Sequence, residues 1–158
     1  MWPSGVEVRP VRPGDITHIS ECMRAQDVDE CLAAGHSDMR QVLAHGVAKS
    51  TWACTAAVGG VPAAIFGVAP LSPNLLDPTG VPWLLGTDLV PQHQRALARL
   101  APRYITEMLR AYPRLMNVVH ARNTVSLRWL ERMGFSIHPP HRHKGTGEMF
   151  HLFEMRDV

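Results

Sequence analysis

One segment, Asn117–Phe135, constrains the fold of this chain more than any other. Within residues 115–121, Leu115, Val118, Val119 and Ala121 are apolar and partly β-branched, which is typical of a buried strand. Asn123 or Thr124 then supplies a side-chain oxygen that caps the first amides of a helix. Apolar side chains recur about once per turn along this helix, and Gly134 suits the left-handed residue that ends it. The segment therefore predicts a strand, a tight junction and a short helix with a defined stop.

The first half of the chain shows both helical and strand periodicity. Alternation of apolar and charged residues at its start indicates a half-exposed strand, and Gly59-Gly60 is typical of a two-residue hairpin turn. In order, we expect a strand over 6–11, a helix capped by Asp15, a helix from Asp27 or Asp29 to Gly35, a helix capped by Ser37, and strands over 50–58 and 62–69.

Proline and glycine determine the predictions for the rest of the chain. Residues 71–82 are rich in turn-forming residues and are predicted to be a loop, and residues 83–90 are predicted to be the central strand. The longest helical pattern follows Pro91 and ends at Pro113. Pro102 removes a backbone donor from it, so we expect a kink or a break there. After Gly134 we expect a strand over 136–138, a loop and a terminal strand over 148–155.

The order of the predicted elements indicates the fold class. With the second and third predicted helices counted as one helical region, that order is β-α-α-β-β-β-α-β-α-β-β, and the 158 residues are enough for one domain with a sizeable core. A mixed sheet with helices on both faces would bury the apolar side of every element. We therefore expect an α/β (α+β) architecture in a single domain over residues 1–158.

Composition excludes several classes of function. The formal net charge is only +2, and the scattered, mostly arginine cations are not interleaved with aromatic residues, so no nucleic acid is expected. No apolar run approaches the roughly 20 residues of a membrane helix, and the N-terminus lacks a signal-peptide layout. Cys22, Cys31 and Cys54 are odd in number and lack metal-ligand spacing. We expect buried thiols in a reducing compartment.

The pattern Asn-x-x-Ser-Leu-Arg-x-Leu-Glu-Arg-Met-Gly-Phe over Asn123–Phe135 resembles the last sequence motif of the GCN5-related N-acetyltransferases, the GNAT family. The asparagine, the serine three residues later and the closing Gly-Phe fall in register, and the predicted element order is also that of the GNAT fold. The resemblance implies a mostly antiparallel sheet in which a central pair of strands splays apart. It also implies that the helix after the splayed strand packs beside the tail of an acyl-CoA.

Further features run along the chain: Asp27-x-x-Glu30 followed by small residues, Pro62-Ala-Ala-Ile-Phe-Gly67, Trp83-x-x-x-Thr-Asp88, Tyr112-x-x-Leu115-x-Asn117-x-Val119, Asn123-Thr124 and Phe150-x-x-Phe153. Their shared order resembles the GNAT-like internal virion proteins of short-tailed bacteriophages. This resemblance implies a virion-associated or morphogenesis protein that contacts phage or host proteins. It also implies a location in the bacterial cytoplasm or the virion, without export through a signal peptide.

In the GNAT family, a glycine-rich loop opens the helix after the central strand, and its bare amides hold the CoA pyrophosphate. The resemblance places cofactor-binding residues at Leu89, Val90, Gln92, His93, Gln94, Arg95 and Asn123. However, residues 90–97 contain no glycine, the residue that allows the closest backbone approach to a ligand. The helix N-terminus remains available to an anion, but the cofactor loop is predicted to be degenerate and acetyl-CoA binding is doubtful.

The resemblance implies that a carboxylate or a water relay takes the proton of an acceptor amine. The candidate bases are Asp88, at the end of the predicted central strand, and Asp29 and Glu30, if the second helix overhangs the cleft. A structural interpretation competes, in which Asp27, Asp29 and Glu30 offset a helix dipole and Asp88 is a turn residue. The tyrosine that often serves the family as general acid is replaced by Leu130.

Histidines gather in His138-Pro-Pro-His141-Arg-His143, and His151 follows. The prolines favour an extended surface loop, and no cysteine or carboxylate stands at ligand spacing, so no structural or catalytic metal is expected.

Two hypotheses from different classes remain. In the first, a phage or prophage protein keeps the GNAT scaffold without the cofactor loop and acts through protein contacts. In the second, the chain is an acetyl-CoA-dependent N-acetyltransferase that acts on a primary amine of a protein or small molecule. The absence of glycine from residues 90–97 favours the first.

Overall fold

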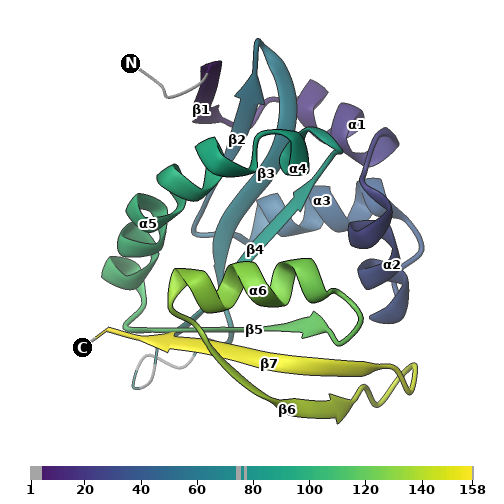
Figure 1. Cartoon of the computed structure of the whole chain (residues 1–158), viewed down its shortest axis with the longest axis vertical. Helices are drawn as coiled ribbons and strands as arrows, with labels where there is room; N and C mark the ends of the chain where they lie inside the picture. The colour runs from purple at the N-terminus through teal and green to yellow at the C-terminus, as the bar shows by residue number, and fades with distance from the viewer. Residues whose placement is uncertain (1–4, 74–75, 77, 158) are drawn as a thin grey trace.

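The computed structural model describes residues 5–73, 76 and 78–157, which form a seven-stranded sheet with helices on both faces (Figure 1). The strands are β1 (Val6–Pro10), β2 (Trp52–Val58), β3 (Val61–Pro70), β4 (Thr79–Gly86), β5 (Arg114–His120), β6 (Ser136–Arg142) and β7 (Met149–Arg156). The helices are α1 (Pro13–Glu21), α2 (Ala25–Ala33), α3 (Met39–Lys49), α4 (Leu89–Gln92), α5 (Gln94–Ala111) and α6 (Thr124–Met133). The strand order is β1-β2-β3-β4-β5-β7-β6, and all neighbours are antiparallel except β4 and β5. The predicted fold class is confirmed.

Strand β3 lies between the two helical layers, because successive side chains of a strand point to opposite faces. Ile65 packs with Ile19 of α1 and Leu43 of α3 on one face of the sheet. Val68 belongs to the core cluster on the other face, together with Met108 of α5. Burial on both faces explains why β3 is apolar along most of its length.

Strands β4 and β5 start as a parallel pair and then separate. Their ladder ends at Gly80 opposite Leu115. Just beyond it, the Asn117 Nδ2 donates a hydrogen bond of 2.8 Å to the Pro82 carbonyl across the widening gap. The splayed central pair is therefore present as predicted, and it divides the sheet into a β1–β4 half and a β5–β7 half (Figure 1). We call the space between the diverging strands the fork.

Two predicted helix caps are wrong. Helix α1 begins at Pro13, where the missing amide of proline removes no helical hydrogen bond. Asp15 therefore lies inside the first turn, where its carboxylate accepts from the Arg12 amide at 2.8 Å. Helix α3 is capped by Asp38 instead of Ser37, and the Asp38 Oδ1 accepts a first-turn amide at 3.1 Å. Aspartate and serine cap equally well, so local sequence did not distinguish these two neighbours.

Prolines account for three further differences. Pro102 does not break α5, because it lies on the exposed side, where water can bond the carbonyl left without a donor. Pro82 lies inside β4, although residues 71–82 were predicted to be a loop, because its backbone faces the fork and not β3. Residues 74–75 and 77 of that loop lie outside the described residues. Pro139 and Pro140 belong to β6, an edge strand with a bulge beside them.

Two observed element boundaries also differ from the predicted ones. Helix α2 begins at Ala25, earlier than the predicted start at Asp27 or Asp29, because the Arg24 amide bonds to the Gly86 carbonyl of β4 at 2.9 Å. The predicted strand over 83–90 ends at Gly86, and its last residues form the short helix α4.

Candidate active site

A cavity of about 450 Å³ occupies the fork and extends beneath α5 and α6. Its lining is mostly apolar and includes Leu84 of β4, Val90 of α4, Leu97 of α5 and Trp129 of α6. An elongated ligand with an apolar or amide-containing arm fits a cleft of this composition. We call this space the fork cavity.

The backbone of β4 offers hydrogen-bonding groups to the fork. In an antiparallel ladder, the backbone amides and carbonyls of alternate residues bond to the neighbouring strand on one side. Those of the residues in between face the other side of the strand. The Thr87 amide donates to the Ala63 carbonyl of β3 at 2.8 Å, so residues in phase with Thr87 face β3 and the others face the fork. Of those others, Pro82 has no amide, and Gly86 bonds to residues near or in α2. The amide and carbonyl of Leu84 therefore face the fork, where the ladder to β5 has already ended.

The first turn of α5 lies beside the same cavity. The first hydrogen bond within this helix runs from the Leu97 amide to the His93 carbonyl at 3.1 Å, so the amides of Gln94, Arg95 and Ala96 have no intrahelical partner. His93 occupies the cap position without a side-chain capping bond. An anion placed there would meet free donors and the positive end of an 18-residue helix.

The residues that the sequence predicted to bind a cofactor are divided among three places. Val90 and Gln94 line the fork cavity. Leu89 and Gln92 belong to α4, and His93 and Arg95 stand at the start of α5. Asn123 lines a second cavity instead.

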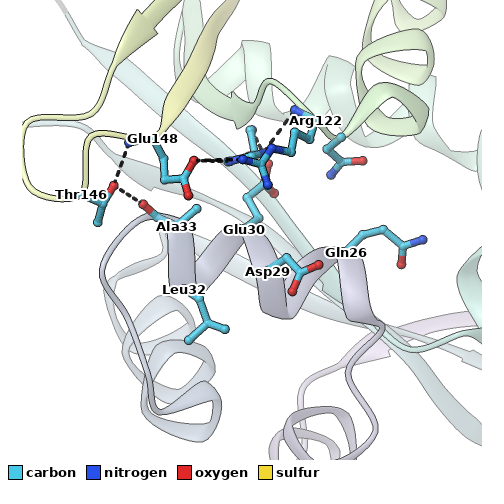
Figure 2. Close-up of a pocket in the computed structure, with 10 residues that line it drawn as sticks. Gln26, Asp29, Glu30, Leu32, Ala33, Arg122, Thr146 and Glu148 are labelled. Atoms are coloured by element: carbon cyan, nitrogen blue, oxygen red, sulfur yellow. Dashed lines mark hydrogen bonds and ion pairs between the residues drawn. The ribbon is translucent and has the colours of Figure 1, made fainter.

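The second cavity, of about 440 Å³, lies between α2, the end of β5 and the loop before β7 (Figure 2). We call it the acidic cavity, because its charged lining consists of Asp29, Glu30, Glu148 and Arg122. The Thr146 hydroxyl donates to the Ala33 carbonyl at 2.6 Å and ties the loop before β7 to the end of α2. This contact closes one side of the cavity, as Figure 2 shows.

Glu30 lines both cavities. Its Oε1 accepts a hydrogen bond of 2.6 Å from the His120 amide at the end of β5, and the side chain points from α2 toward that strand in Figure 2. Burial raises the pKa of Glu30, and the His120 amide opposes the rise without cancelling it. A carboxylate with a raised pKa at the junction of two cavities is a suitable general base.

Asp27, one turn earlier in α2, is 2% exposed and fixes the helix against β4. Its Oδ2 accepts from the Gly86 amide at 2.8 Å and lies 2.8 Å from the Arg24 Nε. Burial raises the pKa of Asp27, although Arg24 opposes this. Because Asp27 and Glu30 share a helix face, the contact with β4 determines where Glu30 stands. The predicted dipole role of Asp27 omitted this tertiary contact.

His120 connects Glu30 to the opposite wall of the acidic cavity. Its Nδ1 accepts from the Arg122 amide at 3.2 Å, so a neutral ring carries its proton on Nε2. That nitrogen lies 3.4 Å from the Glu148 Oε2. Sequence reasoning missed His120, Arg122 and Glu148, since no motif joins them, and it missed Leu84, whose contribution is its backbone.

The remaining candidates stand apart from this junction. Asp88 is exposed at the start of α4 and lines neither cavity, whereas Asp29 is exposed on the wall of the acidic cavity. Asn123 caps α6, as predicted, through its Oδ1 and the Ser126 amide at 3.2 Å. Its Nδ2 is buried and has no hydrogen-bond partner among the described residues.

His138, His143 and His151, in and near β6, bond to other protein groups. The His138 Nε2 lies 3.1 Å from the Glu154 Oε1, the His151 Nδ1 lies 2.8 Å from the His138 carbonyl, and the His143 Nδ1 accepts from the Gly145 amide. Within the ranges that the structure describes, no three His, Cys, Asp or Glu side chains are grouped to hold a metal ion. No helix among these residues is long and apolar enough to cross a membrane.

Comparison with solved structures places this architecture among acetyltransferases. No protein-family model matches the sequence, and no curated protein matches it. The yncA protein of Salmonella typhimurium, solved with its cofactor acetyl-CoA, superimposes with a TM-score of 0.70 at 13% identity, over 98% of this chain and 95% of that one. The ribosomal-protein-S18-alanine N-acetyltransferase of Escherichia coli gives a TM-score of 0.67 at 16% identity, over 97% and 94%.

A GCN5-related N-acetyltransferase from Kribbella flavida gives a TM-score of 0.68 at 15% identity, over 98% of this chain and 99% of that one. At these identities the similarity concerns the fold. The resemblance to phage virion proteins gains no support from these comparisons. The chain has the fold of the GCN5-related N-acetyltransferases.

Proposed function

We propose that this chain is an N-acetyltransferase that moves an acetyl group from acetyl-CoA to a primary amine. The observation that carries the proposal is the position of Glu30, which lines both the fork cavity and the acidic cavity. A donor in one cavity and an amine in the other would meet at this carboxylate. The fold neighbours, one of them solved with acetyl-CoA, support this choice of donor.

The fork cavity suits acetyl-CoA. The apolar lining would hold the pantetheine arm, and the amide and carbonyl of Leu84, which face the fork, would bond to it or to the thioester. The amides of Gln94, Arg95 and Ala96, at the start of α5, would hold the pyrophosphate. Residues 90–97 lack the glycines that would allow the closest backbone approach, but the break between α4 and α5 at His93 leaves the first turn of α5 without a side-chain cap.

Bound acetyl-CoA would supply an activated acyl carbon. The residues of this chain would remove the proton, stabilise the developing charge and position the base. Glu30 would take a proton from the amine as the nitrogen bonds to the acyl carbon, and the carbon–sulfur bond would break with CoA leaving as a thiolate that takes up a proton from solvent. The Leu84 amide, which faces the fork, would stabilise negative charge on the acyl oxygen. Asp27 acts as a positioning residue, because it holds α2, and therefore Glu30, against β4.

The virion-associated role is the alternative, and the glycine-free start of α5 favours it. It predicts a scaffold that has lost its coenzyme. Binding of acetyl-CoA distinguishes the acetyltransferase proposal from the virion-associated alternative. At a hundred times its dissociation constant, a ligand of the folded state adds about 2.7 kcal/mol of stability. We expect a clear rise in melting temperature with acetyl-CoA, and an unchanged melting temperature would contradict the acetyltransferase proposal.

A substitution locates the donor site. Arg95→Ala should weaken acetyl-CoA binding about threefold, more at low salt, because Arg95 stands in the first turn of α5 near the proposed pyrophosphate position. Isothermal titration of both variants checks this, with Arg99→Ala, an exposed cation one turn later, as the matched control. Equal affinities for the two variants would place the pyrophosphate elsewhere.

A further inference from the structure

We infer that the acidic cavity selects an amine that carries both a second positive charge and a hydrogen-bond acceptor, as in the amide of a basic amino acid. The inference names the acceptor class for the proposed transfer reaction. It rests on that proposal for the acetylation step, but selective binding is a property of the cavity itself.

The charge balance of the cavity favours a dication. The lining holds three carboxylates, of Asp29, Glu30 and Glu148, against one guanidinium, of Arg122. That guanidinium is 83% exposed and lies 3.9 Å from Glu148, so it points largely to solvent. Among the described residues, Asp29 has no ion pair or side-chain hydrogen bond and is free to pair with a ligand. The carboxylates left after pairing attract positive charge beyond that of one ammonium group.

The carboxylates are distributed around the cavity. Glu30 points from α2 toward β5, Asp29 projects from the same helix, and Glu148 stands across from α2 (Figure 2). An ammonium group that reaches Glu30 therefore leaves Asp29 or Glu148 for a second ammonium on the same molecule. Leu32, half exposed beside Ala33, offers apolar contact to a methylene chain between the two.

A second, independent observation points to the acceptor atom. Asn123 lines this cavity, is 8% exposed, and has a buried Nδ2 without a partner among the described residues. A buried amide donor without a partner is destabilising, and a ligand that supplies an oxygen would satisfy it. A bare diamine has no such oxygen, whereas the amide of a basic amino acid has a carbonyl and carries no carboxylate to be repelled.

Three probes separate the two features. Lysinamide has two amines and a carbonyl, norleucinamide lacks the second amine, and 1,5-diaminopentane lacks the carbonyl. Titration into the full chain without acetyl-CoA should show lysinamide binding about three to five times more tightly than either analogue. Its advantage over norleucinamide should shrink at high salt, as expected for exposed charges.

Variants assign each preference to a side chain. Asp29→Asn should lower the preference for lysinamide over norleucinamide about threefold, while Glu21→Gln, an exposed carboxylate on α1 outside both cavities, should leave it unchanged. Asn123→Asp removes the amide donor and should abolish the preference for lysinamide over 1,5-diaminopentane. Equal binding of all three probes, or ratios that neither variant alters, overturns the inference.

The outcome is distinct from that of the proposed function. If the protein acetylates norleucinamide as efficiently as lysinamide, the acetyltransferase proposal stands and the acceptor inference fails. If lysinamide binds selectively but is never acetylated, the acceptor inference about the cavity stands and the transfer proposal fails.

Discussion

Glu30 is the residue on which the proposed chemistry depends. Its side chain lines two cavities, and a backbone amide 90 positions later in the chain holds it in place. Burial raises the pKa of this carboxyl group, which makes it a stronger base than an exposed glutamate. Asp88, the other candidate at a strand end, is exposed and lines neither cavity.

Glu30→Gln should lower the rate of acetyl transfer about a hundredfold while acetyl-CoA affinity stays unchanged, because the amide keeps the shape but cannot take a proton. In the unaltered protein, kcat/KM should fall as pH drops through the raised pKa of Glu30, and the variant should lose this dependence. Thiol-release kinetics across pH measure both. Asp88→Asn is the control. An equal loss of rate in that variant would contradict the assignment of Glu30 as the general base.

Asn123 has two roles that substitution can separate. Asn123→Ala removes the α6 cap and should lower the free energy of unfolding by about 1 kcal/mol. Asn123→Asp keeps an oxygen for the Ser126 amide and should stay within about 0.5 kcal/mol of the unaltered protein. Urea unfolding of both variants checks this. An aspartate variant as unstable as the alanine variant would show that the capping bond matters little.

At the scale of elements, single carboxylates join parts of the chain that local sequence keeps separate. Asp15 in α1 lies 2.7 Å from Arg9 of β1 and accepts from the Thr55 hydroxyl of β2 at 2.8 Å. Burial by itself would raise the pKa of Asp15, but hydrogen bonds from Arg9, the Arg12 amide and Thr55 lower it to about 2. The first helix is thereby fixed to the edge of the sheet.

This lowered pKa predicts how stability depends on pH. The folded state favours the carboxylate, so the stability it adds is present above the ordinary pKa of 3.8 and is lost as pH falls toward 2. The difference between the folded and ordinary pKa of Asp15 corresponds to about 2 to 3 kcal/mol. Asp15→Asn should lower the free energy of unfolding by about 2 to 3 kcal/mol at pH 7, and the deficit should shrink between pH 4 and pH 2.

Urea unfolding at several pH values measures this deficit. Asp38→Asn serves as the matched control, because asparagine still caps α3 and its loss of charge should change stability little. A deficit for Asp15→Asn that persists unchanged at pH 2 would mean that the ion pair is not its cause.

At the scale of the whole molecule, the fork depends on a close contact where the two half-sheets join. Gly80 closes the β4–β5 ladder, and a Cβ there would lie 2.6 Å from the Tyr112 ring and 2.8 Å from a Val68 methyl. Any larger residue must displace one of them. The start of the fork is therefore determined by packing between segments far apart in the chain.

Gly80→Ala should lower the free energy of unfolding by about 1 to 3 kcal/mol, because the added methyl overpacks this junction. Gly14→Ala, in α1, meets nothing within 4 Å and should be neutral or slightly stabilising. Denaturant unfolding of the pair checks the prediction. A Gly80→Ala variant as stable as the control would show that the two half-sheets adjust freely.

Local patterns predicted much of the fold. The strand before Asn123, the cap at that residue and the left-handed stop at Gly134, with φ of 100°, all appear in the structure. These features depend on neighbours within one or two turns, so their causes lie within the sequence window itself. Pro82 was wrongly placed in a loop, and the break that Pro102 allowed in α5 is absent, because the cost of a missing amide depends on which way the backbone faces.

The sequence by itself determined the fold class, the junction at Asn123 and the order of the elements apart from the short helix α4, since short-range periodicity and capping decide these. Only the tertiary structure decided the site. Leu84 contributes backbone groups because β5 diverges from β4, and Glu30 gains its raised pKa because β5 and α2 enclose it. Such properties arise from desolvation and contact between distant segments, so no local sequence pattern predicts them.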